Sequence, residues 1–321
     1  MRRYFLSICI PSYNRAFFLR ECLQSIVVAL KGHEDKVEVV ILDNASTDNT
    51  STVVAEFQDR IRNIRYYRNK IFIDAKQNIS KVAQIGEGEY LWVFGDDDKI
   101  DKRAVSAIIN QIENGCNMVV MNVVPFSDEL GQTNKSPYYS VRLPGFLNDH
   151  NLVMKTFSAT ICFISEVVMH HSIVQNRTDN KLELGVEYGF PFVSAIYSSL
   201  KGQCAVRYIS DPLVFNRTGN SGKYDWNTYF INNMAMLLRG LRAEGYSGSS
   251  IRAAKNKIIL FYIIWQLVKQ KLEGGMWRDV YTRLWQYYRD CWTFWVICMP
   301  LALMPGVVLR TCRIVKKYTW R

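Results

Sequence analysis

Three familiar kinds of motif are missing from this 321-residue sequence. Its eight cysteines include no Cys-x-x-Cys pair, which argues against a zinc site and a disulfide framework and fits a reducing compartment. There is no Gly-x-Gly-x-x-Gly and no Gly-Lys-Ser/Thr sequence, so a glycine-rich loop is not what would hold a phosphate. The N-terminus is basic but its apolar run is short, so we expect a first strand there and not a signal peptide.

The positive charge is concentrated at one end of the chain. The formal net charge is +11, and residues 251–321 hold 13 Lys and Arg against three acids. Six of the eight tryptophans lie in the same 71 residues. Basic, apolar and tryptophan-rich sequence is typical of a protein that meets a membrane surface, and it argues against a nucleic-acid groove.

Apolar runs and amphipathic stretches alternate through the first 125 residues. We predict strands at 4–10, 37–42, 64–67, 90–94 and 118–124, with the first strand ended by Pro11. Between them we predict helices at 16–30, 49–59, 75–85 and 102–114. Strands this rich in apolar residues, alternating with amphipathic helices, indicate a mainly parallel sheet covered on both faces, which makes the fold class α/β.

Three polar clusters follow three of these strands, and the most unusual is Asp96-Asp97-Asp98. Adjacent carboxylates repel one another, and a hard divalent cation relieves that repulsion because it takes carboxylate oxygens as ligands. A solvated acidic turn is the alternative. Because ligands of parallel sheets bind beyond the carboxyl ends of the strands, we expect all three clusters to line one crevice.

The other two clusters contain candidate nucleoside contacts. Asp43 could accept hydrogen bonds from a nucleobase or ribose, and Tyr13 could stack on a base. The alternative for Tyr13 is an ordinary loop aromatic. Ser46, Thr47 and Asp48 also suit the N-cap of the helix that follows them.

Taken in order, the clusters resemble a known family. Pro11-Ser-Tyr-Asn-Arg15, Val40-Ile-Leu-Asp-Asn-Ala-Ser-Thr-Asp48 and Gly88-Glu-Tyr-Leu…Gly-Asp-Asp-Asp98 are similar to motifs of the family 2 glycosyltransferases with the GT-A fold. The similarity is greatest to the branch that contains O-antigen abequosyltransferases. The similar region is residues 4–125, and a weaker similarity lies at Tyr208-Ile-Ser-Asp-Pro-Leu-Val-Phe-Asn-Arg217.

The resemblance implies a GT-A nucleotide-sugar-binding fold and assigns candidate roles to residues. The nucleotide-sugar would be held by Pro11, Tyr13, Asn14, Arg15, Asp43, Asn78, Asp96, Asp97 and Arg217. A Mg²⁺ or Mn²⁺ on the diphosphate would be bound by Asp98, with Asp96 as second candidate ligand and Asp96 and Asp97 near the ribose. Arg217 would help to neutralise the diphosphate from a closing loop; an ordinary surface loop is the alternative.

The sequence departs from the family pattern in two places. Many relatives have Asp-x-Asp-Asp, and here Gly95 stands in place of the first acid, which leaves open which carboxylate touches the metal. The stretch 70–78 lacks the glycine that usually precedes the third helix, although Asn78 fits the pattern.

The implied reaction is an inverting displacement at the anomeric carbon by an acceptor hydroxyl, which needs a carboxylate general base. Glu187 is our candidate base and Glu183 the reserve, with plain surface residues as the alternative. The expected function is transfer of a hexosyl or deoxyhexosyl group from a nucleotide-diphosphate sugar to a lipid-linked glycan, in O-antigen, capsule or other cell-surface polysaccharide synthesis. The alternatives are a metal-dependent nucleotidyltransferase and a non-catalytic basic membrane-binding protein.

We expect a catalytic domain at 1–224, divided near 125 into nucleotide-binding and acceptor-binding halves, and a helical membrane-associating region at 225–321. Within that region, 276–288 has the pattern of an interfacial helix whose apolar face carries Met276, Trp277, Val280, Tyr281, Leu284, Trp285 and Tyr288. Residues 291–309 carry no charge and contain Pro300 and Pro305. We expect a shallow or re-entrant segment there and not a span, on the cytoplasmic face of the inner membrane.

Overall fold

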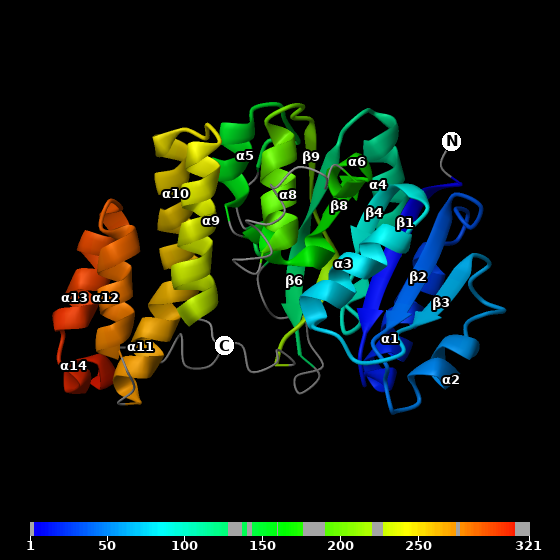
Figure 1. Ribbon diagram of the computed structural model, residues 1–321, viewed down its shortest axis with the longest axis horizontal. Helices are drawn as coiled ribbons and strands as arrows, with labels where there is room; N and C mark the ends of the chain where they lie inside the picture. The colour runs from blue at the N-terminus through cyan, green and yellow to red at the C-terminus, as the bar shows by residue number, and fades with distance from the viewer. Residues whose placement is uncertain are drawn as a thin grey trace. The chain divides into compact units, whose positions relative to one another are not determined.

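The computed structural model describes residues 3–127, 137–139, 143–158, 160–175, 190–219, 227–273 and 277–311. The described parts of 1–149, 161–180 and 199–222 form one compact unit, and those of 150–160, 181–198 and 223–321 form another. Figure 1 labels most of the helices and strands of both units.

The first unit is built on a mixed sheet. Among the described residues, nine strands pair in the order β3-β2-β1-β4-β8-β6-β9-β5, and β7 pairs with β9. Neighbouring strands among β1 to β4 run parallel, as do β6 and β9, whereas β8, β5 and β7 run antiparallel to their partners. The bounds are β1 Tyr4–Ser12, β2 Val37–Asp43, β3 Ile64–Arg68, β4 Gly88–Val93, β5 Lys99–Ile100, β6 Met118–Phe126, β7 Phe146–Leu147, β8 Val167–His170 and β9 Val206–Arg217.

Helices cover both faces of this sheet. The side chains of Leu6, Ile8 and Ile10 in β1 pack in one core with α1 (Ala16–Ala29), α2 (Thr50–Ala55) and α4 (Ala104–Glu113). Helix α3 (Ala75–Ile85) contacts β1, β2 and β4 and covers the opposite face. The predicted α/β fold with a mainly parallel sheet is therefore confirmed, with antiparallel strands that the sequence pattern did not indicate.

The first strand is longer than predicted, because it continues through Pro11 to Ser12. Beyond Cys9 it no longer pairs with β4, and only β2 remains beside it, with Pro11 opposite Leu42. Proline lacks an N–H group, so it is tolerated where one side of a strand has no partner. The extra residues carry the strand to the edge of the crevice.

A buried carboxylate fixes the opposite end of the sheet. Glu38 is fully buried in β2, and its Oε1 accepts hydrogen bonds from Ser7 Oγ and Glu87 N, both at 2.5 Å. Its Oε2 accepts from Arg65 Nη1 at 2.8 Å. Gly88 N donates to Ser7 Oγ at 2.7 Å, so one polar cluster joins the beginnings of three neighbouring strands.

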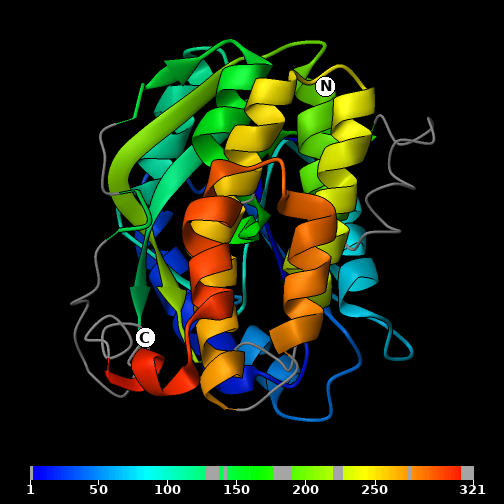
Figure 2. The same ribbon diagram turned by 90° about the vertical axis from the view of Figure 1, so that its left-hand side faces the viewer.

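The second unit is helical. It contains α5 (His150–Phe157), α8 (Pro191–Leu200, up to residue 198), α9 (Met234–Ala243), α10 (Gly248–Ile258), α11 (Ile264–Leu272), α12 (Trp277–Tyr288), α13 (Met299–Leu303) and α14 (Gly306–Thr311). Short π-helical segments lie at η4 (Asn227–Asn233), η5 (Ile259–Ile263) and η6 (Phe294–Cys298). Figure 2 shows α11 to α14 in orange and red. No helix in the described ranges combines the length and apolar character needed to cross a bilayer.

The apolar face predicted for an interfacial helix at 276–288 is largely used inside this unit. Val280, Leu284 and Tyr288 of α12 are buried, and Tyr288 OH donates to Phe230 O at 2.8 Å. Trp285 of the same helix remains exposed. A helical apolar stripe does not distinguish a protein core from a lipid surface, and here most of the stripe contacts the core.

A substitution at Gly88 would test how closely β1 and β4 approach each other. A Cβ added there would lie 2.6 Å from the Ser7 backbone nitrogen, which cannot move without breaking the β1–β4 pairing. We predict that Gly88→Ala lowers the free energy of unfolding by about 1–3 kcal/mol, as overpacking typically does. Urea unfolding would measure this loss.

Gly145→Ala is the matched control, because an added Cβ there meets nothing within 4 Å. Its free energy of unfolding should stay within about 0.5 kcal/mol of the parent. Equal stabilities of the two variants would contradict the tight approach of β1 and β4.

Candidate functional site

The site lies in the first unit, at the carboxyl ends of β1, β2 and β4. Ser12 at the end of β1 pairs with Asp43 at the end of β2, and Phe94 N, just after β4, donates to Cys9 O at 2.9 Å. The three polar clusters predicted from the sequence therefore come together because their strands are direct neighbours. This is the edge where parallel sheets bind ligands.

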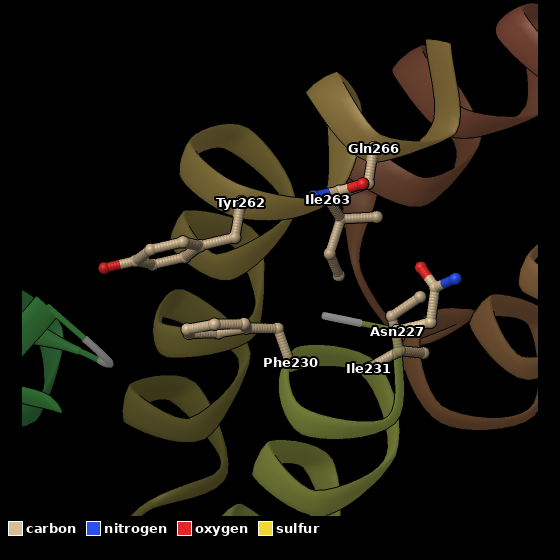
Figure 3. A pocket seen from close by; sticks show the side chains of 6 residues that line it. All are labelled: Asn227, Phe230, Ile231, Tyr262, Ile263 and Gln266. Atoms are coloured by element: carbon tan, nitrogen blue, oxygen red, sulfur yellow. The ribbon is translucent and has the colours of Figure 1, made fainter. Parts of the chain in front are cut away.

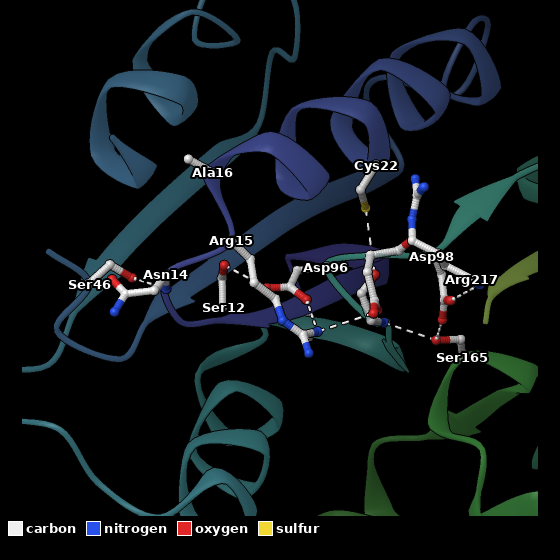
Figure 4. A network of polar contacts seen from close by, with 12 residues as sticks. Ser12, Asn14, Arg15, Ala16, Cys22, Ser46, Asp96, Asp98, Ser165 and Arg217 are labelled. Carbon is white, nitrogen blue, oxygen red and sulfur yellow. Dashed lines mark hydrogen bonds and ion pairs between the residues drawn. The ribbon is translucent and has the colours of Figure 1, made fainter. Parts of the chain in front are cut away.

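Asp96 is held by the loop that follows β1. Ser12 Oγ donates to Asp96 Oδ2 at 2.7 Å, and Arg15 Nη1 donates to Asp96 Oδ1 at 3.0 Å (Figure 4). Burial raises the pKa of Asp96 to about 6, although the Arg15 charge opposes that shift. Asp96 thus ties the triple aspartate to the Pro11–Arg15 motif.

Asp98 is held by three donors from other parts of the unit. Ser165 Oγ donates to its Oδ2 at 2.6 Å, and Asn216 Nδ2 and Arg217 N both donate to its Oδ1 at 3.1 Å. Burial, and next the neighbouring Asp97 charge, raise the pKa of Asp98 to about 7. Both oxygens of the carboxylate predicted to bind the metal are thus engaged inside the protein.

Asp97 is the most accessible of the three carboxylates. Its side chain is partly exposed, and Arg15 Nη1 lies 3.2 Å from its Oδ2. Within the described part of the chain, its Oδ1 receives no hydrogen bond. One guanidinium therefore touches both Asp96 and Asp97, and Asp97 keeps an oxygen available for a further ligand.

Gly95 makes room for this arrangement. A Cβ added at Gly95 would lie 2.8 Å from Asp98 Oδ2 and 3.2 Å from Asp97 Oδ1. Ser165 Oγ also accepts a hydrogen bond from Gly95 N at 2.9 Å. The glycine at the position where many relatives carry an acid is thus explained by the close packing of the carboxylates that follow it.

The side chain of Arg217 is buried and points to the back of the aspartate turn. Its Nε donates to Asp97 O at 2.9 Å, and its Nη2 pairs with Glu21. The guanidinium also lies over the rings of Phe18 and Phe126, at 5.0 and 4.7 Å from their centroids. These contacts fix the turn, and the contact of Arg217 with a diphosphate stays a prediction.

The loop after β1 is locked to the loop after β2. Asn14 adopts a positive φ of 52°, a conformation that asparagine tolerates better than most residues. Its backbone N–H donates to Ser46 Oγ at 2.9 Å, and its Oδ1 accepts from Thr47 N at 2.7 Å. Asn14 therefore positions Tyr13 and Arg15, which flank it.

Asp43 is fully buried at the end of β2. Its Oδ1 accepts from Ser46 N at 2.8 Å and its Oδ2 from Tyr66 OH at 2.6 Å, and burial together with Asp43 raises the pKa of Tyr66. Each carboxylate oxygen can accept more than one hydrogen bond. A contact between Asp43 and the nucleoside stays a prediction.

Asn78 belongs to a buried group of amides under the same edge. Its Oδ1 accepts from Asn69 Nδ2 at 2.8 Å, and its Nδ2 donates to Leu42 O at 3.3 Å. Asn69 also donates to Asn44, which binds both the N–H and the C=O of Ile73. These bonds hold the 71–73 loop in place, and a direct contact of Asn78 with the nucleotide stays a prediction.

Tyr13 is 42% exposed at the mouth of this edge, and it has an aromatic neighbour that the sequence did not single out. The ring of Phe72, from the loop that Asn44 holds, lies 4.7 Å from the Tyr13 ring, centroid to centroid. Phe72 lies in the stretch that lacks the glycine usual in the family. The pair forms an exposed aromatic surface suited to stacking on a base.

The donors available to a metal ion are few. Among the residues that the structure describes, no three His, Cys, Asp or Glu side chains form a group that could hold a metal ion. Mg²⁺ is commonly held by one or two carboxylates together with phosphate oxygens and water. The aspartate cluster fits a metal that binds together with a nucleoside diphosphate, and it does not form a complete protein cage.

The structure identifies some site residues that the sequence did not predict, and some predicted residues lie outside the part of the chain that it describes. Ser12, Ser165 and Asn216 hold the aspartates and were not predicted. Ser12 lies in the motif at 11–15 and Asn216 in the weaker similarity at 208–217, whereas Ser165 lies in neither. The candidate bases Glu183 and Glu187 lie outside the described residues.

A small pocket lies in the helical unit, between η4 and η5 (Figure 3). Its empty volume is about 170 Å³ and includes open solvent, and its lining includes Asn227, Tyr262 and Gln266. The side chains that line it carry no charge. We therefore assign it no part in the reaction.

A nucleotide-binding α/β fold with a triple aspartate at the carboxyl edge of its sheet is the arrangement of GT-A glycosyltransferases. The family model "Glycosyl transferase family 2" matches residues 7–176. The chain belongs to this family, whose members invert the anomeric centre, and it transfers a sugar from a nucleotide-sugar donor.

Two curated relatives illustrate the match. Abequosyltransferase RfbV of Salmonella typhimurium is 26% identical over 226 residues, 67% of this chain and 67% of that protein. A Campylobacter jejuni GalNAc(5)-diNAcBac-PP-undecaprenol beta-1,3-glucosyltransferase is 26% identical over 112 residues, 34% of this chain and 35% of that protein.

Solved structures share the fold. TarS of S. aureus in complex with UDP has a TM-score of 0.65 and 13% identity, covering 98% of this chain and 91% of that chain. The mannosyltransferase PcManGT from Pyrobaculum calidifontis, in complex with GDP-Man and Mn²⁺, has a TM-score of 0.53 and 15% identity, covering 98% and 85%. At this identity the likeness establishes the fold alone.

The buried aspartates give the folded protein a pH dependence. With pKa values of about 7 for Asp98 and about 6 for Asp96, the folded protein holds protons that the unfolded chain has released. The free energy of unfolding should therefore fall as the pH rises from about 4 to about 7, by about 1.4 kcal/mol per unit of pKa shift. Burial also raises the pKa of Glu166, which adds to this fall. We predict that Asp98→Asn makes the fall smaller, measured by urea unfolding in EDTA.

Asp35→Asn is the control, because Asp35 is exposed on the surface. It should leave the pH dependence unchanged. A decline in Asp98→Asn as steep as that of the parent would contradict the assignment of a proton to Asp98.

Proposed function

We propose that the protein transfers a sugar from a nucleotide-diphosphate sugar to a hydroxyl of a lipid-linked glycan, by metal-assisted inverting displacement. The observation that carries the proposal is the bonded cluster of Ser12, Arg15 and Asp96, which joins the motif after β1 to the triple aspartate. A nucleotide placed across this edge would have its base near Tyr13 and its diphosphate near the aspartates.

The nucleoside half of the donor would lie on the loops after β1, β2 and β3. Tyr13 and Phe72 offer aromatic faces for the base. The loops that carry these rings are shaped by Pro11, Asn14 and Asp43. Asn78 supports them through its hydrogen bond to Leu42 O. A base that stacks on an aromatic ring gains roughly 1–3 kcal/mol.

We propose Asp97 as the aspartate that faces a Mg²⁺ or Mn²⁺ in the donor complex. Its support is the free Oδ1 of Asp97, beside an Asp98 whose two oxygens already accept three hydrogen bonds. Asp96, engaged by Ser12 and Arg15, would lie near the ribose. The metal would stabilise the negative charge of the departing diphosphate.

Arg15 pairs with two of the three aspartates. Its Nη1 lies 3.0 Å from Asp96 Oδ1 and 3.2 Å from Asp97 Oδ2. In the donor complex the same guanidinium would be within reach of a phosphate or of the ribose. A fork of N–H donors suits phosphate oxygens as well as carboxylates.

The acceptor side is proposed from the chemistry that the reaction needs. Glu187, with Glu183 in reserve, would accept the proton of the attacking hydroxyl. A lipid-linked acceptor is supported by the Campylobacter relative, whose name contains an undecaprenol diphosphate, and by the basic tryptophan-rich sequence of 251–321. We place the protein at the cytoplasmic face of the inner membrane, bound peripherally or monotopically through the helical unit.

Nucleotide-sugar binding tests the proposal. A panel of nucleotide sugars would be screened for thermal stabilisation with Mn²⁺ and with EDTA, because a ligand that binds only the folded state raises its melting temperature. We predict that one donor class stabilises the protein with Mn²⁺ only, and that turnover releases a nucleoside diphosphate. Glu187→Gln should keep donor binding and lose transfer by about 10²–10⁴-fold.

The control is the same panel with the matching nucleoside triphosphates. Release of pyrophosphate from a triphosphate would show a nucleotidyltransferase. No metal-dependent stabilisation by any nucleotide sugar would reject the donor site.

A further inference from the structure

The helix that runs through η6 and α13 is apolar on every side. It lies within 291–309, which contains no charged residue. Its inner face packs into the helical unit through Phe294, Cys298 and Ala302, spaced four residues apart and all buried. Its outer face is equally apolar, and no described part of the unit covers it.

The outer face is exposed to an unusual degree for side chains of this kind. Trp292 is 57% exposed, Trp295 48%, Val296 63% and Leu303 76%. Their spacing of three, four and eleven residues from Trp292 places them on one side of the helix. A helix that is apolar all round is normally enclosed by core or by lipid, so the outer face requires a partner.

Trp285 of α12 extends this surface onto a second helix. Its ring lies 5.6 Å from that of Trp295, centroid to centroid. The indole Nε1 of Trp295 donates to Arg289 O at 2.8 Å, which fixes the ring at the surface. The patch is therefore a continuous, positioned group of large apolar side chains, defined here as Trp285, Trp292, Trp295, Val296 and Leu303.

Two exposed cations without an acidic partner lie at the edge of this patch. Arg278 of α12 is seven residues before Trp285, with its guanidinium over the Trp277 ring, and Arg289 lies in the turn directly after α12, four residues beyond Trp285. Neither guanidinium forms an ion pair with any residue that the structure describes. The nearby acids are already neutralised, since Asp279 pairs with Arg283 and Asp290 with Lys255.

We propose that this patch docks on an anionic lipid bilayer, with the tryptophans and Val296 at the level of the headgroups and Arg278 and Arg289 on lipid phosphates. Tryptophan rings beside arginines suit the membrane–water interface. Most of this patch lies within 291–309, where we expect a shallow membrane segment from the sequence, and it also includes Trp285 of the predicted α12 stripe, whose Val280, Leu284 and Tyr288 are buried. This inference rests on the proposed function in one respect: a lipid-linked acceptor would be reached at the same membrane surface.

Pro300 is compatible with a helix lying on such a surface. It stands at the beginning of α13, directly after the π-helical turn η6. Proline cannot donate to a carbonyl in the preceding turn, and an irregular turn accommodates that loss. The helix can therefore continue to Leu303 and keep its outer residues on one side.

Vesicle binding by the full-length protein tests the proposal. The parent and a Trp292→Gln/Val296→Gln variant would be sedimented with phosphatidylcholine vesicles, with and without phosphatidylglycerol. We expect the parent to bind the anionic vesicles, and the variant to bind them at least roughly tenfold more weakly, because two apolar side chains no longer leave water. Arg278→Gln and Arg289→Gln should each lower the affinity about fivefold, and only with phosphatidylglycerol present.

Leu152→Gln is the matched control, because Leu152 of α5 is a comparably exposed apolar residue in the same unit. It should bind vesicles as the parent does. Undiminished binding by the Trp292/Val296 variant would overturn the proposal, as would a parent dimer that this variant converts to a monomer. Metal-dependent nucleotide-sugar stabilisation is measured on the same variants, so a failed donor site and a failed membrane surface are distinguished.

Discussion

The separation of three adjacent carboxylates is the constraint on which the site depends. Asp96, Asp97 and Asp98 repel one another at close range, and two of them are buried. The fold resolves this by directing each carboxylate to different partners. Asp96 turns to Ser12 and Arg15, Asp98 turns to Ser165, Asn216 and the Arg217 backbone, and Asp97 is left facing outward.

This constraint explains why residues near β8 and β9 are needed to position the aspartates that follow β4. Ser165 lies in the short helical turn Ile164–Glu166 that leads into β8, and Asn216 and Arg217 are the last two residues of β9. All three donors to Asp98 therefore come from the part of the first unit that follows β6 in the chain. Arg217 adds a hydrogen bond to Asp97 O and an ion pair with Glu21 of α1. The aspartate turn is thus held by residues that precede it in the chain and by residues that follow it. Gly95, which has no Cβ, leaves room for the carboxylates of Asp97 and Asp98 beside it.

The parts of the fold that the sequence predicts are those with a strong local signal. Short, mostly apolar runs such as 37–42 indicate buried strands, and the motifs that follow them mark the binding edge. β5, β7 and β8 have two to four residues, too few for a pattern to identify them. The local sequence does not distinguish the three consecutive aspartates from one another. The orientation of Asp98, for example, depends on Ser165 and Asn216, which lie 67 and 118 residues away in the chain.

The helical unit shows the same limit in another form. The sequence predicts an amphipathic stripe at 276–288, and the structure uses Val280, Leu284 and Tyr288 of that stripe for its own core. Most of the exposed apolar side chains lie on the neighbouring helix, within the uncharged segment 291–309 that the sequence predicts to meet the membrane, and Trp285 of the α12 stripe lies beside them. Periodicity identifies which residues avoid water, and tertiary packing decides which of them the protein itself covers.

The role of Asp97 is tested most directly by the affinity of Mn²⁺ for the protein in the presence of a saturating nucleoside diphosphate, measured by electron paramagnetic resonance. Asp97→Asn should weaken Mn²⁺ binding by more than the roughly 10–100-fold that loss of an outer-shell partner produces, and Asp98→Asn by no more than that range. Circular dichroism would confirm that both variants are folded. Tighter Mn²⁺ binding in Asp97→Asn than in Asp98→Asn would contradict the outward-facing Asp97 as the metal ligand.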